Sequence, residues 1–220
     1  MSVTQALKDV RKGKFVLIHD ADSRENEVDM TIAAERVTPQ AVASMRVDAG
    51  GLICIAITSG IAEKLELPYI QDVYRASSMP LFRALKADDI PYDEKSAFSL
   101  TINHRKTFTG ITDVDRALTI REFAHLAKQP SLARFGRDFR TPGHVHTLIS
   151  SGLANRRGHT ELSTTLVEMA GLTPVAAICE MMDAKTHKAL SLSKARAYAR
   201  RHRLTLIDTS DILAHWEALK

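Results

Sequence analysis

The sequence has few cysteines, no long apolar run and no leader-like beginning, and each absence narrows the class of protein. Its two cysteines, Cys54 and Cys179, are too few for a disulfide framework, and their apolar surroundings favour buried reduced thiols. No apolar run approaches the ~20 residues of a membrane-spanning helix. The first residues, M-S-V-T-Q-A-L-K, lack the charged and apolar regions of a signal peptide. We therefore expect a cytoplasmic protein with no membrane partner.

The sequence also lacks repeats, low-complexity tracts and linkers, so residues 1–220 are expected to form one domain. A content of 45% hydrophobic and 25% charged residues is typical of a globular protein. The net charge of +4 fits nucleic acid weakly and a small phosphorylated substrate equally well. Apolar runs of strand length alternate with segments of helical spacing, which indicates a mixed α/β fold.

The expected elements follow from apolar spacing, caps and glycine or proline breaks. Strands are expected at 14–19, 28–34, 52–58, 97–103, 144–149, 174–180 and 204–208. Helices are expected at 3–12, 39–49, 59–67, 119–128, 160–170, 193–203 and 210–219. A capping box of Thr119 and Glu122 would open the helix at 119–128. Residues 68–95 and 129–143 are expected to be irregular, and loops of such length are often functional.

The loop between the first two strands, D-A-D-S-R-E-N-E-V-D at 20–29, carries five carboxylates and one arginine, Arg24. At this density near a core the carboxylates need a counter-charge, which Arg24, a distant arginine or a divalent cation could supply. If the loop is extended, Glu25, Glu27 and Asp29 share one face and suit Mg²⁺. A calcium hand is excluded because the sixth position is Glu25 instead of glycine. A solvated turn is the alternative.

A second polar stretch, R-R-G-H-T-E at 156–161, stands just before an expected helix. A helix N-terminus binds anions, and two arginines add bidentate recognition of phosphate. Thr160 can cap the helix or contact phosphate, and a neutral His159 beside a phosphate can be a metal ligand. The alternative, a capped helix with an exposed basic turn, is less favoured.

Three further residues are candidates for proton transfer. In P-G-H-V-H at 142–146, the two histidines could bind zinc, but no third ligand stands nearby, so His144 is favoured as an acid/base. Glu180 ends an apolar strand, where open α/β sheets place their sites, although it could also be a rim carboxylate paired with an arginine. A free cysteine in an apolar run is more often a packed apolar residue than a catalyst, so Cys54 stays a minor candidate for acid/base chemistry.

The basic segment K-A-R-A-Y-A-R-R-H-R at 194–203 favours a different function, an RNA- or nucleotide-binding module. A helix there spreads its charge around much of its circumference, so a solvated face is the simpler interpretation. The acidic loop argues against a nucleic-acid surface, and no nucleic-acid partner is expected.

In order and spacing, the motifs closely resemble the 3,4-dihydroxy-2-butanone 4-phosphate synthase family of riboflavin biosynthesis. The matching segments are D-S-R-E-N-E-V-D at 22–29, G-L-I-C-I-A-I at 51–57, T-G-I-T-D-V-D-R-A-L-T-I at 109–120, P-G-H-V at 142–145, R-R-G-H-T-E at 156–161 and C-E at 179–180. Val28 and Arg157 depart from the family pattern, which commonly has glycine at the first position and alanine or glycine at the second. Because the sequence ends with this domain, the stand-alone form is expected.

The resemblance implies a three-layer α-β-α sandwich of mixed α/β type that works as a homodimer with its sites at the subunit interface. It implies a lyase that converts D-ribulose 5-phosphate to formate and L-3,4-dihydroxybutan-2-one 4-phosphate. The steps are enolisation, dehydration, skeletal rearrangement and loss of C4. A divalent ion, Mg²⁺ or Mn²⁺, would act as a Lewis acid on the sugar carbonyl.

The resemblance also assigns residues to roles. Glu25 and His159 are the expected metal ligands, and His144 and Glu180 match the pair essential for catalysis, with Cys54 as a further candidate. Asp20 and Glu27 are expected to help with protons, and Asp22 to be solvated. The residues expected to bind substrate are Arg24, Glu25, Asp29, Thr109, Arg156, Arg157, Gly158, His159, Thr160 and Glu180.

Overall fold

The computed structural model describes residues 2–21 and 23–220, so Asp22 lies outside the described residues. A seven-stranded mixed sheet of order β4-β5-β3-β6-β2-β1-β9 forms its centre. The strands are β1 (Val16–His19), β2 (Val28–Ala33), β3 (Cys54–Thr58), β4 (Phe98–His104), β5 (Phe139–Ser150), β6 (Val175–Glu180) and β9 (Thr205–Asp208). A separate two-stranded ladder joins β7 (Met182–Asp183) to β8 (Lys188–Ala189).

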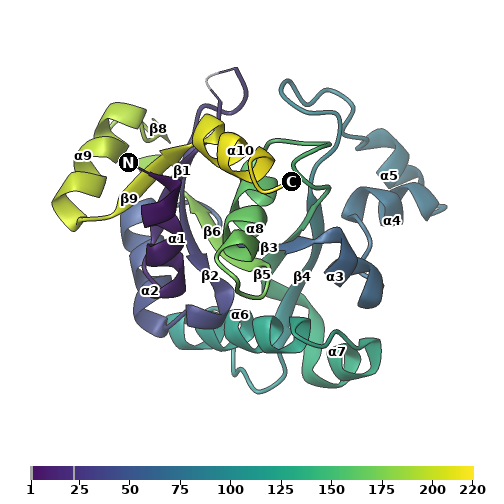
Figure 1. Cartoon of the computed structure of the whole chain (residues 1–220). Coiled ribbons are helices and arrows are strands. Elements are labelled where there is room, and N and C mark those ends of the chain that lie inside the picture. The colour runs from purple at the N-terminus through teal and green to yellow at the C-terminus, as the bar shows by residue number, and fades with distance from the viewer. Residues whose placement is uncertain (1, 22) are drawn as a thin grey trace.

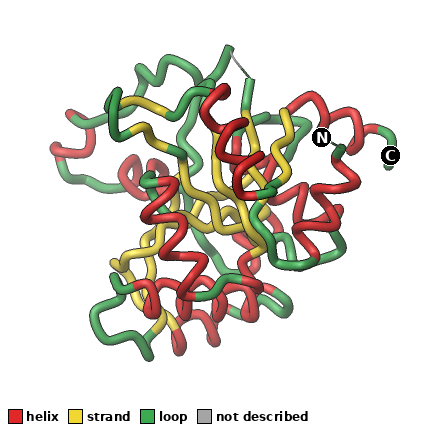
Figure 2. Tube along the Cα trace, turned by 90° about the vertical axis from the view of Figure 1, so that its left-hand side faces the viewer, coloured by secondary structure: helices red, strands yellow, loops and turns green. Residues whose placement is uncertain are grey.

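Helices cover both faces of the sheet (Figures 1 and 2). One core packs the sheet against α2 (Pro39–Ser44), α6 (Asp113–Ala127) and α9 (Leu192–His202). The other packs it against α1 (Val3–Arg11), α8 (His159–Met169) and α10 (Thr209–Glu217). These layers confirm the α-β-α sandwich. The shorter helices are η1 (Ala34–Arg36), the π-helical turn η2 (Met45–Ala49), α3 (Ser59–Lys64), α4 (Ile70–Ala76), α5 (Pro80–Ala84) and α7 (Leu132–Asp138).

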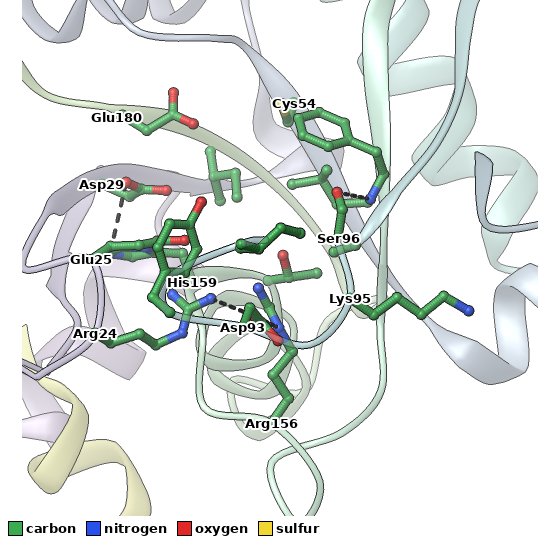
Figure 3. Close-up of a pocket in the computed structure, with 17 residues that line it drawn as sticks. Arg24, Glu25, Asp29, Cys54, Asp93, Lys95, Ser96, Arg156, His159 and Glu180 are labelled. Carbon is green, nitrogen blue, oxygen red and sulfur yellow. Dashed lines mark hydrogen bonds and ion pairs between the residues drawn. The ribbon is translucent and has the colours of Figure 1, made fainter. Parts of the chain in front are cut away.

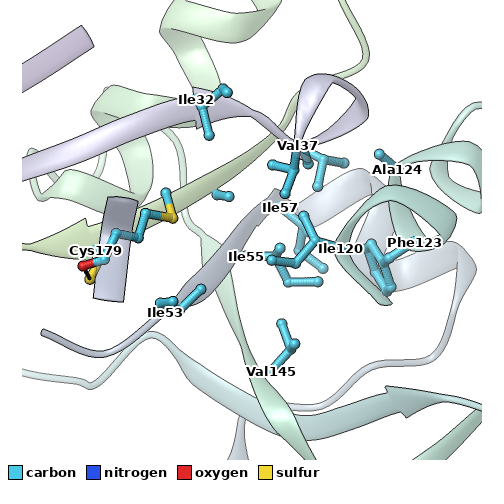
Figure 4. Close-up of a cluster of buried hydrophobic side chains, with 14 of the residues drawn as sticks. Ile32, Val37, Ile53, Ile55, Ile57, Ile120, Phe123, Ala124, Val145 and Cys179 are labelled. Atoms are coloured by element: carbon cyan, nitrogen blue, oxygen red, sulfur yellow. Dashed lines mark hydrogen bonds between the residues drawn. The ribbon is translucent and has the colours of Figure 1, made fainter. Parts of the chain in front are cut away.

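Strand β3 shows why the run L-I-C-I-A-I-T is apolar throughout. Successive side chains of a strand point to opposite faces. Ile55 and Ile57 therefore enter the core beneath α6 (Figure 4). Cys54 and Ala56 enter the core beneath α8 on the other face. A strand covered by helices on both faces needs apolar residues at every position.

Strand register brings candidate residues that are distant in sequence to the same end of the central strands. Asp29 on β2 lies opposite Glu180, at the end of β6. Cys54, at the start of β3, lies opposite Ile178 on β6 and His146 on β5. Because β2 and β3 both run antiparallel to β6, their first residues meet its carboxyl end.

The described helices include none that is both long and apolar enough to cross a membrane.

The expected start of the helix at 119–128 is wrong. Helix α6 begins at Asp113, where the Thr112 hydroxyl accepts a hydrogen bond from the amide of Asp115 at 3.1 Å. Two aspartates in the first turn favour this start because they complement the helix dipole. Thr119 lies inside the helix, where its hydroxyl accepts from the amide of His104 at 3.0 Å.

The two segments expected to be irregular are partly helical. Residues 68–95 contain α4 and α5, with Pro80 at the start of α5, a position that proline favours. Residues 129–143 contain α7 and the first part of β5, which therefore begins earlier than expected. Proline and glycine predicted breaks here, but the pieces between them include short helices: α4 packs on the edge strand β4, α5 packs on α4, and α7 packs on β5. Figure 1 shows α4 and α5 beside β4.

A substitution of Phe123 would measure how much the core beneath α6 contributes to stability. Phe123 is 0% exposed, and its ring meets Phe135 and Phe139 edge-on with centroids 5.9 Å apart. We expect Phe123→Ala to lower the free energy of unfolding by about 3–5 kcal/mol, because it leaves a cavity. Chemical denaturation measures this loss. Leu219→Ala, which truncates an exposed side chain, should change the free energy by about 0.5 kcal/mol or less; comparable losses in both variants would contradict this account.

Candidate active site

The acidic loop is held in place by Asp20, which is buried. Its carboxylate accepts hydrogen bonds from the amides of Glu25 at 3.1 Å and Glu27 at 3.0 Å, and from Arg24 Nη1 at 3.2 Å. The loop is therefore a turn, with Asn26 at φ 54°, and the extended form considered from the sequence does not occur. The turn directs Glu25 toward α8.

The R-R-G-H-T-E segment is held by Glu161, which is fully buried. The Glu161 carboxylate accepts from the amide of Gly158 at 3.2 Å, from the amide of Ser151 at 3.0 Å and from Arg156 Nη1 at 2.6 Å. Glycine at 158 lets the two guanidinium groups approach the backbone, because a Cβ there would lie 2.5 Å from Arg156 Nη1 and 2.8 Å from Arg24 Nη2 and would displace both. The two arginines thus close over the first residues of α8.

The acidic loop and the α8 terminus meet at His159, which is buried. Its Nδ1 lies 3.2 Å from Glu25 Oε2, and its Nε2 lies 3.7 Å from Asp29 Oδ1. Burial alone lowers an imidazole pKa, but the carboxylates of Asp29, Glu25 and Asp20 outweigh it and raise the pKa of His159 to about 9. Burial, partly offset by His159, raises the pKa of Asp29 to about 7. Such perturbed groups in one cleft are typical of functional sites.

This cluster fits a divalent metal ion. Asp20, Glu25 and His159 each offer a ligand atom, and these atoms lie within 4.8 Å of one another. Asp20 already accepts three hydrogen bonds, so it serves the loop more than a metal. Among the described buried atoms, Asp29 Oδ1 and His159 Nε2 have no hydrogen-bond partner. Carboxylate oxygens with one imidazole suit Mg²⁺ or Mn²⁺.

The opposite wall is formed by Glu180 and Cys54. Glu180 Oε2 accepts from the amide of Leu52 at 2.7 Å. A Cβ at Gly51 would clash with that same oxygen and would lie 2.5 Å from the Glu180 carbonyl oxygen, so glycine lets the backbone approach this residue. Cys54 is buried, and burial together with the charges of Glu180 and Asp29 raises the pKa of its thiol well above the usual value. The thiol therefore stays protonated at neutral pH.

These groups line one cavity of about 200 Å³ (Figure 3). The residues expected from the sequence that line it are Arg24, Glu25, Asp29, Cys54, Arg156, His159, Thr160 and Glu180. Gly158 lies under the two arginines. Arg157 is exposed and does not line the cavity. Most of the lining residues that the sequence did not indicate come from the segment 90–98 and include Tyr92, Asp93, Lys95 and Ser96; Leu148 on β5 and Ile178 on β6 complete them. For the segment, the only signal was the length of the expected irregular stretch 68–95.

His144 and Thr109 lie in a different cluster. The amide of His144 donates to Asn103 Oδ1 at 2.9 Å, and its Nδ1 lies 3.0 Å from Asn103 Nδ2. Thr109 Oγ1 donates to Asp115 at 3.4 Å. Both residues are exposed, and neither lines the cavity. Within one chain, the structure therefore does not bring them together with His159 and Glu180.

The fold is an α-β-α sandwich, and a buried carboxylate–histidine cluster lies beside two arginines at the ends of its central strands. These features define a class of enzyme suited to a metal ion and an anionic small molecule. The model of the family described as 3,4-dihydroxy-2-butanone 4-phosphate synthase matches residues 4–215. The chain belongs to this family, as its motifs indicated.

The chain is also similar to individual members of this family. The chain is 49% identical over 215 residues to 3,4-dihydroxy-2-butanone 4-phosphate synthase of Methanothermobacter thermautotrophicus, covering 96% of this chain and 94% of that protein. It is 48% identical to the enzyme of Archaeoglobus fulgidus, covering 98% and 94%. A solved synthase described as being in complex with two magnesium ions superposes with a TM-score of 0.80 at 31% identity, covering 99% and 97%. These findings give no support to the RNA-binding alternative.

Proposed function

We propose that this chain converts D-ribulose 5-phosphate to formate and L-3,4-dihydroxybutan-2-one 4-phosphate as a metal-dependent lyase. The observation that carries the proposal is the meeting of the acidic loop with the α8 terminus at His159, 3.2 Å from Glu25. Over the whole reaction one water leaves the sugar and one returns, so the two products hold all atoms of the substrate. A cytoplasmic location stays a prediction of the sequence.

Glu25 and His159 would hold the metal ion, with Asp29 Oδ1 beside them. When bound there, Mg²⁺ or Mn²⁺ supplies a Lewis acid that polarises the substrate carbonyl. The oxygen-rich donor set favours Mg²⁺, and its single imidazole also admits Mn²⁺. The two ligands come from elements 134 residues apart, so the fold itself assembles the metal site.

Arg24, Arg156 and the N-terminus of α8 at Thr160 would hold the phosphorylated sugar. Arg157 stands outside the cavity and would contribute charge at its rim. Glu180 Oε2 is engaged by the Leu52 amide, which leaves Oε1 to exchange a proton with the substrate. The protonated thiol of Cys54 would exclude water from the far wall of the cavity or exchange a proton there.

We further propose that a second copy of the chain completes the site with His144 and Thr109. Both residues are exposed. Apolar side chains surround Thr109, with Phe108 93%, Ile111 50% and Val114 63% exposed. Exposed apolar groups clustered beside functional residues are typical of an interface, and a symmetric dimer would bury two such surfaces.

Formate release is the direct test. Purified protein with D-ribulose 5-phosphate and Mg²⁺ should release formate, EDTA should stop it, and excess Mg²⁺ should restore it, because the Lewis acid supplies several kcal/mol of the barrier reduction. Formate can be measured with a coupled dehydrogenase or by NMR. Absence of formate with metal present, or release that persists undiminished in EDTA, would refute the proposal.

A further inference from the structure

Residues 90–96 form a strap that runs across the cavity between α5 and β4. The strap contains no helix or strand, and Ile90, Tyr92, Asp93, Lys95 and Ser96 all line the cavity. Its position makes it part of the site, although none of its residues belongs to the motifs that identified the family.

Asp93 lies between the two arginines of the cavity (Figure 3). Its Oδ2 accepts from Arg24 Nη2 at 2.9 Å and from Arg156 Nε at 2.6 Å. Partial burial alone raises a carboxyl pKa, but the two guanidinium groups outweigh it and lower the pKa of Asp93. A carboxylate therefore sits where two convergent arginines would receive an anion.

Each arginine also forms ion pairs with carboxylates other than Asp93. Arg24 Nη1 pairs with Asp20 at 3.2 Å and with Glu25 at 2.8 Å. Arg156 Nη1 pairs with the fully buried Glu161 at 2.6 Å. Both guanidinium groups are thus held by other carboxylates without Asp93, and both arginines line the cavity.

A second strap residue, Tyr92, also meets an arginine, with its ring centroid 5.4 Å from Arg24 Cζ, whereas Lys95 contacts other groups. Lys95 pairs with Asp72 at 2.9 Å and lies 3.8 Å from the centroid of the Tyr69 ring, both near α4. Among the described residues, Asp93 is the only strap residue that forms an ion pair with Arg24 or Arg156. Moving Asp93 aside would free Arg24 Nη2 and Arg156 Nε and leave the strap attached through Lys95.

We propose that Asp93 is an internal anion that competes with the substrate's phosphate for Arg24 and Arg156. This inference rests on the proposed function in one respect, that the two arginines receive a phosphate group. A phosphate monoester carries about −1.5 to −2 charges at pH 7, so it displaces a carboxylate from two arginines. A monoanion such as acetate or the product formate gains little over the carboxylate it replaces. Asp93 therefore lowers the affinity for both kinds of anion by a similar factor, so that monoanions, which bind the arginines more weakly, stay unbound at concentrations where the phosphorylated sugar still binds.

The test compares Asp93→Asn with Asp89→Asn, a matched control that removes the same charge from an exposed residue outside the cavity. Inorganic phosphate and acetate are titrated into each folded variant by calorimetry or NMR at constant ionic strength. We expect Asp93→Asn to bind both anions about tenfold more tightly than the wild type, because a charge-assisted hydrogen-bond competitor is gone. Both should tighten by a similar factor, because the same competitor opposes both. Asp89→Asn should match the wild type.

Three results would overturn the inference. Weaker phosphate binding by Asp93→Asn would mean that Asp93 orients the arginines for the substrate. Unchanged binding would mean that it does not occupy the anion position. Equal tightening in Asp89→Asn would mean that net charge alone is responsible. Asp93→Ala, which should act in the same direction, guards against a specific effect of the amide.

Failure of this inference is distinguishable from failure of the proposed function. Anion binding is measured without turnover, so it decides the role of Asp93 by itself. If the wild type releases no formate from the sugar phosphate with Mg²⁺ present, the proposed function fails whatever Asp93 does. If the wild type releases formate and Asp93→Asn does not bind phosphate more tightly, only the inference fails.

Discussion

Glu25→Gln should lose metal binding and about 10³-fold or more of kcat while remaining folded. The amide keeps the size of the side chain but removes the charge that a hard divalent cation requires. A lost Lewis acid costs several kcal/mol of barrier reduction, and each 1.36 kcal/mol is about tenfold in rate. The fold should persist because Asp20, and not the Glu25 side chain, holds the acidic loop through the amides of Glu25 and Glu27.

Calorimetry with Mg²⁺ or Mn²⁺ and the formate assay measure the two losses, and circular dichroism checks the fold. Glu27→Gln is the matched control, since it removes the same charge from the same loop. It should retain metal binding, because Glu27 is not among the described groups that place ligand atoms around His159. Full activity of Glu25→Gln would refute its assignment as a ligand.

Subunits carrying Glu25→Gln and subunits carrying His144→Ala should each be inactive alone and should recover activity when mixed. If His144 acts in the partner's cavity, a mixed dimer has one site with both substitutions and one with neither. With random assortment, half of the dimers are mixed and each has one intact site of two, so activity should return to about a quarter of the wild type. The formate assay measures this in the mixture, and mixed dimers isolated by coexpression with two affinity tags should show about half of the wild-type activity.

A second mixture controls for this result. Glu25 and His159 come from the same chain and contact each other at 3.2 Å. Mixing Glu25→Gln with His159→Asn should therefore restore nothing, because every site of the mixed dimer keeps one defective ligand. Recovery in this mixture, or none in the mixture with His144→Ala, would contradict a site shared between subunits.

The fold and the cavity differ in how much of each could be predicted from the sequence. Buried strands such as β3 were predictable because an apolar run needs no knowledge of its neighbours to be recognised. The start of α6 was not, because Thr112 and Thr119 both resemble caps and only the packing of Thr119 against β4 decides between them. Local pattern predicts an element better than its boundary.

The same division holds inside the cavity. Glu25 and His159 stand in dense polar motifs, so the sequence pointed to both before the structure joined them. Asp93 stands in a stretch without periodicity, and only its contacts with Arg24 and Arg156 reveal it. The sequence placed Glu161 in the R-R-G-H-T-E motif, but it did not predict that this carboxylate is buried and paired with Arg156.

The sequence by itself determined the family, the layered fold and the chemical types at the site, because these depend on residue identity, order and spacing. The tertiary structure decided which groups meet. It turned the acidic loop toward His159, set Asp29 opposite Glu180, and left His144 outside the cavity. The physical reason is that a hydrogen bond or ion pair acts over a few ångströms, whereas these partners are brought together only by strand register and helix packing.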